Sequence, residues 1–503
     1  MSGGAGAALA AAREAQQGWA ARPTHERCKL VAGVRHGLAE RVDALGEALV
    51  HAVPARRTTA EALSGEVLPL LSAASWLGKR GTRVLAGRRV GAWGRPAWLM
   101  GHSATVQRRP LGVVLVIAPG NYPLMLAGIQ ALQALAAGNA VLLKPAPGTS
   151  AVVGMLAEAL GDAGLPSGLF DVLGDTVEAG REAVGARVDQ VVFTGSAATG
   201  RAILGELAER LTPAVVELSG CDAMFVLPEA EDAQLRRAAA AIVFGLTYNG
   251  SQTCIAPRRV FVPTAKVDRL IELMREQMGE TVDRVPVDEA VAGRLRELID
   301  RAVADGAQVV MGGAIGADGS CEVTVLRDVP VATPLVSSDT FAPWVAMVAC
   351  DGVDAMAEAD THCPYQLSAS IFGPAASARA LASRIGAANI AINDVIVPTA
   401  DPRLPFAAAG ESGYGVTRGP EGLLAMTRPV VVAERRGGMP RHYDTDTPGL
   451  DRLLLAAIRL THGRGQRLKA VAELASAVTR LGKPTPHDAR DNASPPDDPP
   501  SGP

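Results

Sequence analysis

Apolar residues recur along this chain at two different spacings. From about residue 8 to 90 they return every three or four positions, as in CKLVAGVRHGLAERVDALGEALVHAV, which is typical of helices with one buried face. Beyond residue 112, short runs such as VVLVIAP, AVLLKP and DQVVFTGS alternate with longer amphipathic stretches. Runs that are continuous in Val, Leu and Ile predict strands buried on both faces. The pattern therefore favours an α/β fold, in which helices cover both sides of a parallel sheet.

A second α/β segment follows between about 220 and 405, with strand candidates RRVFVP, PWVAMVAC and LSASIFG. Two further strands are predicted outside it, in HSATVQRRPLG before the first buried strand and in AMTRPVVVAE near 425–434. Because 503 residues are too many for one compact core, we expect at least two packed lobes.

The composition changes after Glu434. Residues 436–448 resemble a loop, and 450–482 contain two short amphipathic helical patterns. Seven basic residues stand against two acidic ones between 448 and 483, a net charge of +5. This basic amphipathic extension could bind a membrane surface or a protein partner, or pack onto its own protein as a helical hairpin. The last stretch, 484–503, is rich in Pro and Asp and is expected to be disordered.

Bulk composition narrows the class of protein. A hydrophobic fraction of 48% with 20% charged residues is that of a globular protein, and a formal charge of −3 argues against a nucleic-acid partner. The six cysteines form no CxxC pair and the eight histidines no metal-ligand spacing, so we expect reduced thiols, no metal site and a cytoplasmic location. Arg13 and Glu14 interrupt the alanine-rich N-terminus, which predicts a helix rather than a signal peptide.

Cys254 is the first candidate for chemistry. A lone cysteine is most often a small buried hydrophobe. This one follows the polar, glycine-containing turn NGSQT, where a thiol can meet substrate. A thiolate there can attack an aldehyde carbonyl and form a thiohemiacetal.

Two further polar residues stand at the ends of buried strands. Asn121 comes directly after GVVLVIAP, and its amide can steady an oxyanion, although asparagine is also common in turns. Glu217 ends the apolar strand AVVEL. If it is buried, desolvation raises its pKa and suits it to act as a general base; the alternative is a solvated strand-end glutamate.

The turn FTGSAATG lies between a predicted strand and a helix. Gly195 and Ser196 can present N–H groups to a pyrophosphate there, even though the turn differs from the GxGxxG fingerprint. Lys144, at the end of AVLLKP, lies at the mouth of the same sheet. It can bind ribose hydroxyls or remain solvated.

Together these segments resemble the NAD(P)-dependent aldehyde dehydrogenase superfamily over roughly residues 10–435. The motifs that carry the resemblance are GVVLVIAPGNYP, ALAAGNAVLLKP, VVFTGSAATG, VVELSG, NGSQTC, DTFAPW and LPFAAAGESGYG.

The resemblance implies an aldehyde-dehydrogenase-like α/β fold. Its parts would be a Rossmann-like dinucleotide-binding domain (8–98 and 111–217) and an α/β catalytic domain (218–410). A β-hairpin oligomerisation element (99–110 and 424–435) would make the protein a homodimer or homotetramer. The helical C-terminal extension, 436–483, lies beyond the match.

The resemblance also implies roles for matched positions. Cys254 matches the nucleophile, Glu217 the base for deacylation and Asn121 the oxyanion donor. Among cofactor-binding positions, the matches are Lys144 for ribose, Gly195 and Ser196 for pyrophosphate, Asp339 for nicotinamide ribose and Phe341 beside the nicotinamide.

Several positions depart from the family pattern. Asp339 replaces the usual glutamate, so the acceptor is kept on a side chain one methylene shorter. Ser219 and Cys221 replace a glycine and a lysine, and Ala342 another glycine. Pro147 stands where a glutamate often repels the 2′-phosphate of NADP. NAD is preferred because KPAPGTS offers no arginine for that phosphate, and NADP stays open.

We therefore predict oxidation of an aldehyde to a carboxylic acid with hydride transfer to NAD(P)⁺. Uncharged Thr253 and Ile255 flank the nucleophile, and Tyr122, Met125, Leu126 and Ile129 follow Asn121, which favours an apolar aliphatic or aromatic aldehyde. The alternatives are a coenzyme-A-acylating relative and a family member that has lost catalysis and serves as a scaffold.

Overall fold

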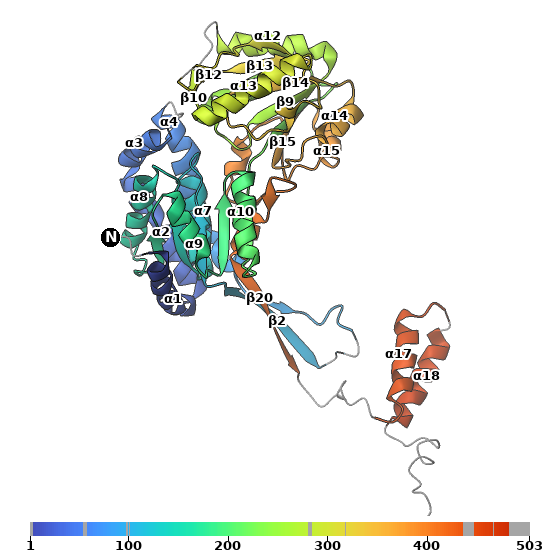
Figure 1. Ribbon diagram of the computed structural model, residues 1–503. Coiled ribbons are helices and arrows are strands. Elements are labelled where there is room, and N and C mark those ends of the chain that lie inside the picture. Colours follow the sequence, from blue (N-terminus) through green and yellow to red (C-terminus); the bar gives the residue numbers. More distant parts are fainter. Residues whose placement is uncertain are drawn as a thin grey trace, which may run out of the picture. The chain divides into compact units, whose positions relative to one another are not determined.

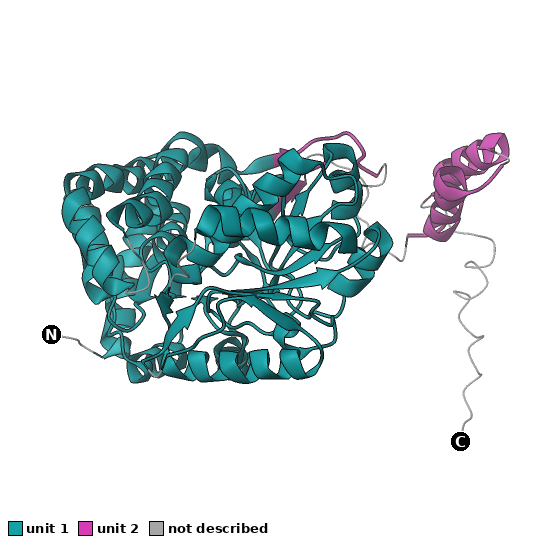
Figure 2. Ribbon diagram, turned by 90° about the horizontal axis from the view of Figure 1, so that it is seen from above, with its two compact units in different colours: residues 1–88, 106–431 teal, residues 89–105, 432–503 magenta. Residues whose placement is uncertain are grey.

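The computed structural model describes residues 4–53, 58–96, 99, 101–279, 284–316, 318–435, 447–465 and 467–481. They divide into two compact units, shown in different colours in Figure 2. The first holds residues up to 88 and 106–431; the second holds 89–105 and the chain from 432 onward. The predicted tail at 484–503 lies outside the described residues. No helix among the described residues has the length and apolar character needed to span a bilayer.

The first sheet is six-stranded, in the order β18-β7-β6-β3-β4-β5, and all pairings are parallel except that of β18 with β7. Every residue of β3 and β4 is buried, as the continuous apolar runs predict. The strands are β3 (Val113–Ile117), β4 (Ala140–Lys144), β5 (Phe170–Val172), β6 (Gln190–Thr194), β7 (Ala214–Glu217) and β18 (Gly413–Tyr414).

Helices cover this sheet (Figure 1). Four of them connect its strands: α7 (Met125–Ala137), α8 (Ser150–Asp162), α9 (Val177–Gly185) and α10 (Ala197–Ala208). Among the N-terminal helices, α2 packs on both α7 and α8, α5 packs on α7 and α3 packs on α8. They are α1 (Ala5–Ala21), α2 (Thr24–Glu40), α3 (Val42–Ala52), α4 (Thr59–Ala62), α5 (Leu68–Trp76) and α6 (Thr82–Val84), with π-helical turns η1 (Leu63–Val67) and η2 (Leu77–Gly81).

The second sheet is seven-stranded, in the order β11-β13-β14-β9-β8-β15-β16, and only β11 is antiparallel to its neighbour. Successive residues of β8, an inner strand, enter different cores: Phe225 belongs to one hydrophobic cluster and Met224 to another. Both faces are thus covered. The strands are β8 (Asp222–Val226), β9 (Pro257–Val262), β11 (Gln308–Met311), β13 (Thr324–Arg327), β14 (Trp344–Ala349), β15 (Ser368–Phe372) and β16 (Asn389–Ile392).

The helices of this lobe are α11 (Asp232–Thr247), α12 (Val267–Met278), α13 (Glu289–Ala304), α14 (Val353–Asp360) and α15 (Ala375–Ala382). Short 3₁₀ turns are η4 (Tyr248–Ser251), η5 (Thr264–Lys266), η6 (Pro334–Ser337) and η7 (Val397–Ala400). Small strand pairs are β10 (Arg284–Pro286) with β12 (Ser320–Glu322) and β17 (Phe406–Ala407) with β19 (Val416–Thr417), and α16 (Gly419–Ala425) follows.

The two strands predicted outside the lobes are present. β2 (His102–Pro110) lies between β1 (Arg88–Val90) and β20 (Thr427–Arg435) in a three-stranded sheet. They coincide closely with the ranges 99–110 and 424–435 expected for an oligomerisation element, whose role stays a prediction.

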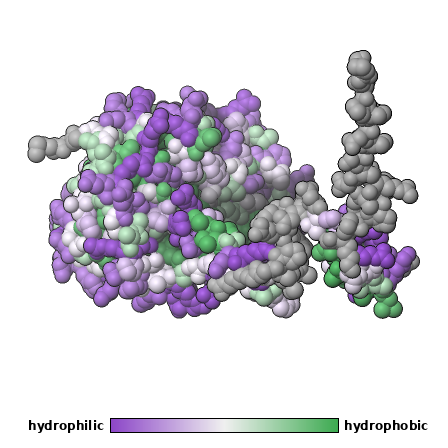
Figure 3. Space-filling model, turned by 90° about the horizontal axis from the view of Figure 1, so that it is seen from below, coloured by the Kyte–Doolittle hydropathy of each residue, from purple (hydrophilic) through white to green (hydrophobic). Residues whose placement is uncertain are grey.

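Two helices form the described part of the C-terminal extension, α17 (Leu450–His462) and α18 (Arg467–Arg480). They pack against each other through alanines, and Arg459 donates to Glu473 across them at 3.1 Å. Apolar side chains remain exposed on the hairpin, where Figure 3 shows hydrophobic (green) surface. They are Leu454, Leu455, Ile458, Leu468, Val471 and Val478. The predicted amphipathic helices are therefore confirmed, and their partner stays a prediction.

Candidate active site

Two cavities meet at Cys254. One is a cleft of about 1730 Å³, part of it open to solvent, at the carboxyl ends of the first sheet's strands. The other is a pocket of about 910 Å³ with a mostly apolar wall. Cys254 lines both, together with Leu126, Phe406 and Arg418. Ligands of open α/β sheets bind at such strand ends, so the cleft is where a cofactor site is expected.

Seven of the eight predicted site residues line the cleft. They are Asn121, Gly195, Ser196, Glu217, Cys254, Asp339 and Phe341. The eighth, Lys144, lies at the end of β4 and is not among the lining residues. The fold thus brings together side chains that are more than two hundred positions apart in the sequence.

The turn before Cys254 is fixed by backbone conformation and a buried arginine. Asn249, Gly250 and Ser251 have φ values of 51°, 57° and 60°, the left-handed region that is costly for residues other than glycine. Arg258 holds this turn because its guanidinium donates to Ser251 Oγ at 2.8 Å and to Ser251 O at 2.5 Å. Strained backbone of this kind is typical of functional sites, and here it sets the position of Cys254.

The Cys254 thiol is in a low-dielectric setting. Burial, together with the negative charges of Asp222 and Glu217, raises the pKa of Cys254 to about 12, while Arg418 opposes this shift. The thiol is therefore protonated near neutral pH, and attack on a carbonyl requires that its proton be taken up by a base.

Asn121 is bound to the turn that carries Cys254. Its Nδ2 donates to Gln252 O at 2.8 Å, and its backbone O accepts from Asn249 Nδ2 at 3.0 Å. Its Oδ1 accepts from Tyr122 N at 3.0 Å, which fixes the orientation of the amide.

Glu217 is buried, with 4% of its surface exposed, so the alternative of a solvated strand-end glutamate is wrong. Burial raises the pKa of its carboxyl, and this outweighs the opposing effects of Arg418, Thr417 and Thr194. Thr194 Oγ1 donates to Oε2 at 3.4 Å and Thr417 Oγ1 to Oε1. A buried carboxylate with a raised pKa is suited to accept a proton from water.

The turn at 193–200 differs in one detail from expectation. The Gly195 N–H donates to Glu217 O at 3.0 Å, so it is already used within the protein. Ser196 caps α10, and its Oγ accepts from Thr199 N at 3.2 Å. Within the first turn of α10, the donors left for an anion are the N–H groups of Ala197 and Ala198, and the helix dipole also favours negative charge there.

Lys144 is held beside an acidic residue that the sequence analysis missed. Its Nζ donates to Asp175 O at 2.9 Å, and burial lowers the pKa of the ammonium. The Asp175 carboxylate accepts from Gly148 N at 3.0 Å, and this bond lowers its pKa. Asp175 lies in the loop after β5, outside every motif, so no local signal marked it.

The segment with Asp339 and Phe341 forms the opposite wall of the cleft. Arg294 Nη1 lies 3.5 Å from Asp339 Oδ1. Thr340 O accepts from Trp344 Nε1 at 3.1 Å and thereby holds the segment against the second sheet. Asp339 therefore presents a carboxylate to the cleft, partly neutralised by Arg294.

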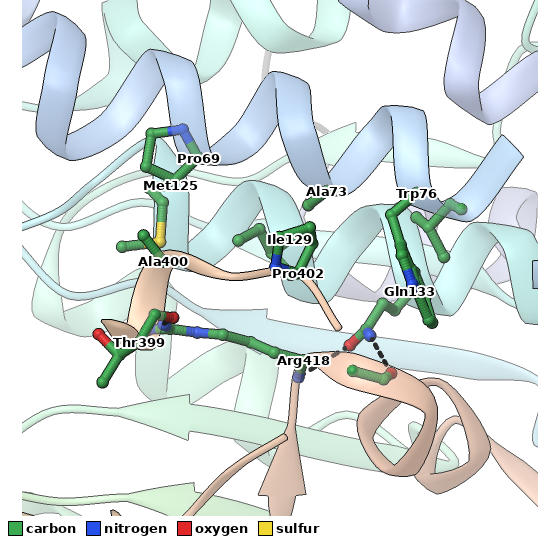
Figure 4. Close-up of a pocket in the computed structure, with 12 residues that line it drawn as sticks. Pro69, Ala73, Trp76, Met125, Ile129, Gln133, Thr399, Ala400, Pro402 and Arg418 are labelled. Atoms are coloured by element: carbon green, nitrogen blue, oxygen red, sulfur yellow. Dashed lines mark hydrogen bonds between the residues drawn. The ribbon is translucent and has the colours of Figure 1, made fainter. Parts of the chain in front are cut away.

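The apolar pocket is lined by the segment that follows Asn121 and by distant loops. Tyr122, Met125 and Leu126 line it as predicted, with Thr253 and Ile255 beside the thiol. Ile129 instead lines a smaller neighbouring cavity between α5 and α7 (Figure 4). The sequence analysis missed the rest of the wall, including Phe244, Tyr248, Ile396, Val397, Phe406 and Arg418.

Comparison with known proteins defines the class of protein. The family described as "Aldehyde dehydrogenase family" matches residues 4–432. The chain therefore belongs to the aldehyde dehydrogenase family. It is an NAD(P)-dependent oxidoreductase that acts on aldehydes.

Individual relatives support this membership. A 4,4'-diapolycopene aldehyde oxidase of Methylomonas sp is 33% identical over 445 residues, which cover 86% of this chain and 82% of the relative. An NAD(+) benzaldehyde dehydrogenase of Pseudomonas putida is 31% identical, covering 81% and 84%. The NADP-dependent glyceraldehyde-3-phosphate dehydrogenase of Bacillus halodurans C-125, solved with NADP, has a TM-score of 0.77 at 30% identity, covering 86% and 90%.

A dinucleotide fits the residues of the cleft. The first turn of α10 offers donors, Lys144 lies at the end of β4 in the same sheet and Asp339 presents an acceptor. Within the described residues, no group of three or more His, Cys, Asp or Glu side chains is arranged to hold a metal ion.

Proposed function

We propose that Cys254 is the nucleophile, Glu217 the general base and Asn121 an oxyanion donor in the oxidation of an apolar aldehyde to its acid. The single observation that carries this proposal is the position of Cys254 at the junction of the two cavities. An aldehyde that enters through the apolar pocket reaches the thiol from the pocket side, and the cleft on the other side would hold the cofactor.

In the first half of the reaction, Cys254 Sγ forms a bond to the carbonyl carbon, the C=O π bond breaks to leave an oxyanion, and the thiol proton passes to solvent through the open cleft. The resulting oxyanion is stabilised by Asn121 Nδ2 and the Cys254 backbone N–H, each worth about 3 kcal/mol in the transition state. Bound NAD(P)⁺ supplies the acceptor for the hydride that leaves this carbon. The product on the enzyme is a thioester of Cys254.

In the second half, Glu217 removes a proton from the water that attacks the thioester carbon. The carbon–sulfur bond breaks, the acid is released, and the proton held by Glu217 passes to the Cys254 thiolate, which restores both groups. The raised pKa of Glu217 supports this role because a stronger base accepts a proton from water more readily.

The apolar pocket favours an aliphatic or aromatic aldehyde over a semialdehyde. Its lining has one cation, Arg418, and no carboxylate. Two of the relatives compared act, by their names, on a diapolycopene aldehyde and on benzaldehyde, which are apolar. A long or bulky apolar chain would bury its surface against Met125, Leu126 and Phe244, at about 25 cal/mol per Å².

NAD is the preferred cofactor in this proposal. Pro147 lines the cleft and Asp175 lies next to Lys144, so the ribose end has a carboxylate nearby, whose charge would repel a 2′-phosphate. An Asp175→Asn variant should therefore narrow the difference in kcat/KM between NAD and NADP.

The decisive experiment is dinucleotide reduction at 340 nm with a chain-length series of aldehydes. It uses NAD and NADP, wild type and Cys254→Ala. Reduction that rises with chain length and is lost in Cys254→Ala supports the proposal. Retained turnover in Cys254→Ala would overturn the assignment of the nucleophile.

Product analysis with and without coenzyme A tests the acylating alternative. If an acyl-coenzyme A forms in place of the acid, the thiol of coenzyme A attacks the thioester instead of water activated by Glu217. A folded protein that binds neither dinucleotide would instead favour the scaffold alternative.

We further propose that β2 and β20 assemble the protein into a homodimer or homotetramer, which sedimentation would measure. The hairpin α17–α18 is proposed to contact a membrane surface or a protein. Its exposed apolar residues and basic charge support this role.

A further inference from the structure

Arg418 is a buried cation at the point where the cavities meet. Only 7% of its surface is exposed, and it lines the cleft, the apolar pocket and the small cavity of Figure 4. It lies shortly after the segment LPFAAAGESGYG, outside every motif of the sequence. A buried guanidinium is costly unless it is paired, so its presence calls for an explanation.

The backbone at Arg418 is strained and held in place. Arg418 has a φ of 59°, in the left-handed region that is uncommon for non-glycine residues. Gln133 clamps this turn from α7: its Oε1 accepts from Arg418 N at 3.2 Å, and its Nε2 donates to Gly419 O at 3.1 Å (Figure 4). Gly419 has a φ of 58°, and a Cβ there would lie 2.7 Å from Pro405 N. The conformation therefore depends on glycine at 419 and glutamine at 133.

The guanidinium is anchored at one end and unpaired at another. Its Nη1 donates to Thr399 O at 2.7 Å, and its centre lies 4.6 Å from the centroid of the Phe406 ring. Its Nε is buried and has no hydrogen-bond partner among the described residues. The other cation that lines the cleft, Arg294, has a side chain that is 57% exposed and is paired with Asp339. Arg418 is thus the buried positive charge of this site.

Three acids line the same cavities as Arg418: Glu217 the cleft, Tyr122 the pocket and Cys254 both. Glu217 comes from β7, Cys254 from the turn after η4 and Tyr122 from the segment before α7, and each favours the protonated form of Arg418. In return, Arg418 lowers the pKa values of Glu217 and Cys254 against the larger effect of burial. Asp222, from β8, acts on Cys254 in the opposite direction.

We propose that Arg418 is a positioning residue, whose buried charge, fixed by Gln133 and Thr399, keeps Glu217 ionised and favours the thiolate of Cys254. The inference rests on the roles proposed above for these two residues. It explains why a strained turn delivers an arginine into a mostly apolar pocket. A purely structural role, packing on Phe406, is the competing explanation.

The test compares variants that differ in charge at similar length. Arg418→Met removes the charge, and Arg418→Lys keeps it. Arg403→Met is the matched control, because Arg403 is 76% exposed and pairs with Asp401 outside the site. The first readout is the rate of alkylation of Cys254 by iodoacetamide at pH 8, with Cys254→Ala as the blank; the other cysteines are buried. Each rate is also measured in a Glu217→Gln background, which separates the thiol from the carboxylate.

We expect alkylation to slow by about tenfold or more in Arg418→Met, since one pKa unit changes the thiolate fraction tenfold. The acid limb of the kcat profile should move to higher pH, because Glu217 would take up a proton more readily. Arg418→Lys should restore most of both effects, and Arg403→Met should match wild type.

The proposal would be overturned if folded Arg418→Met were alkylated at Cys254 within about twofold of the wild-type rate. It would also be overturned if Cys254 were alkylated as slowly in Arg418→Lys as in Arg418→Met. If Arg418→Met does not fold, the comparison of Arg418→Lys with Arg418→Gln decides, because only the former keeps the charge. Dinucleotide binding, followed by fluorescence, reports that the cleft is intact. Turnover by Cys254→Ala would refute the proposed function itself, a result distinct from either of these.

Discussion

The two cavities at Cys254 are built in opposite ways. The cleft gathers polar groups from strand ends and helix termini, such as Ser196, Glu217 and Asp339. The pocket is walled by side chains of helices and loops, such as Met125, Phe244 and Ile396. The first arrangement suits a cofactor with many hydrogen-bonding groups, and the second suits a ligand recognised by its shape and apolar surface. The cleft therefore holds the groups that carry out the reaction, and the pocket selects the aldehyde.

Among the residues of the cleft, substitution of Glu217 should lower the steady-state turnover most. In Glu217→Gln, steady-state kcat should fall by about 10²–10⁴-fold because no base activates water. The first turnover should survive, so stopped-flow mixing should still show a burst of reduced dinucleotide. Loss of the burst together with kcat would mean that Glu217 acts before the thioester forms.

Removal of the Asn121 amide should have the next largest effect. Asn121→Ala should lower kcat by about 10²–10³-fold, the value of one oxyanion donor, with little change in dinucleotide KM. Because Asn121 also binds Gln252 O, the alkylation rate of Cys254 serves as the control. A matching fall in that rate would show that the turn, rather than the oxyanion, was disturbed.

A larger side chain in the pocket should alter the choice of aldehyde alone. Met125→Trp should lower kcat/KM for the longest aldehydes by about tenfold to a hundredfold, because overfilled apolar sites cost 1–3 kcal/mol. Short aldehydes and the dinucleotide KM should be nearly unaffected. An equal loss for every chain length would contradict the separation of the two cavities.

A smaller change should improve dinucleotide binding in the cleft. Asp339→Glu adds the methylene that this chain lacks relative to its family and should lower the dinucleotide KM by about two- to tenfold, the value of one improved hydrogen bond. The dependence on aldehyde chain length should not move. A raised dinucleotide KM would mean that the ion pair of Asp339 with Arg294 matters more for binding than the length of the side chain at position 339.

The smallest effect concerns stability. The pKa of Glu217 is raised above 4.5 by burial, so the protonated carboxyl stabilises the fold fully below pH 4.5 and this contribution is lost as pH rises. Glu217→Gln resembles the protonated form and should gain melting temperature relative to wild type as pH rises, on the order of 1 °C at neutral pH. Thermal melts at pH 4 and pH 8 would measure the difference, which should be absent at the lower pH.

The sequence by itself determined the elements and the chemistry. Continuous apolar runs predicted β3, β4 and β6, because a strand buried on both faces has no polar side to interrupt it. Cys254, Glu217 and Asn121 were found because each stands in a short motif at the end of an element. Four of the residues that line the cleft, Asn121, Gly195, Ser196 and Glu217, follow or end strands of the first sheet, and parallel strands end at a common edge.

Only the tertiary structure decided which groups modify that chemistry. Asp175 beside Lys144 and Arg418 beside Glu217 come from segments without a local signal. The use of the Gly195 N–H by Glu217 likewise depends on how β6 and β7 pair. Electrostatic coupling and hydrogen bonding act over a few ångströms in space, whatever the separation along the chain, so the motifs located the reacting groups while the fold set their environment.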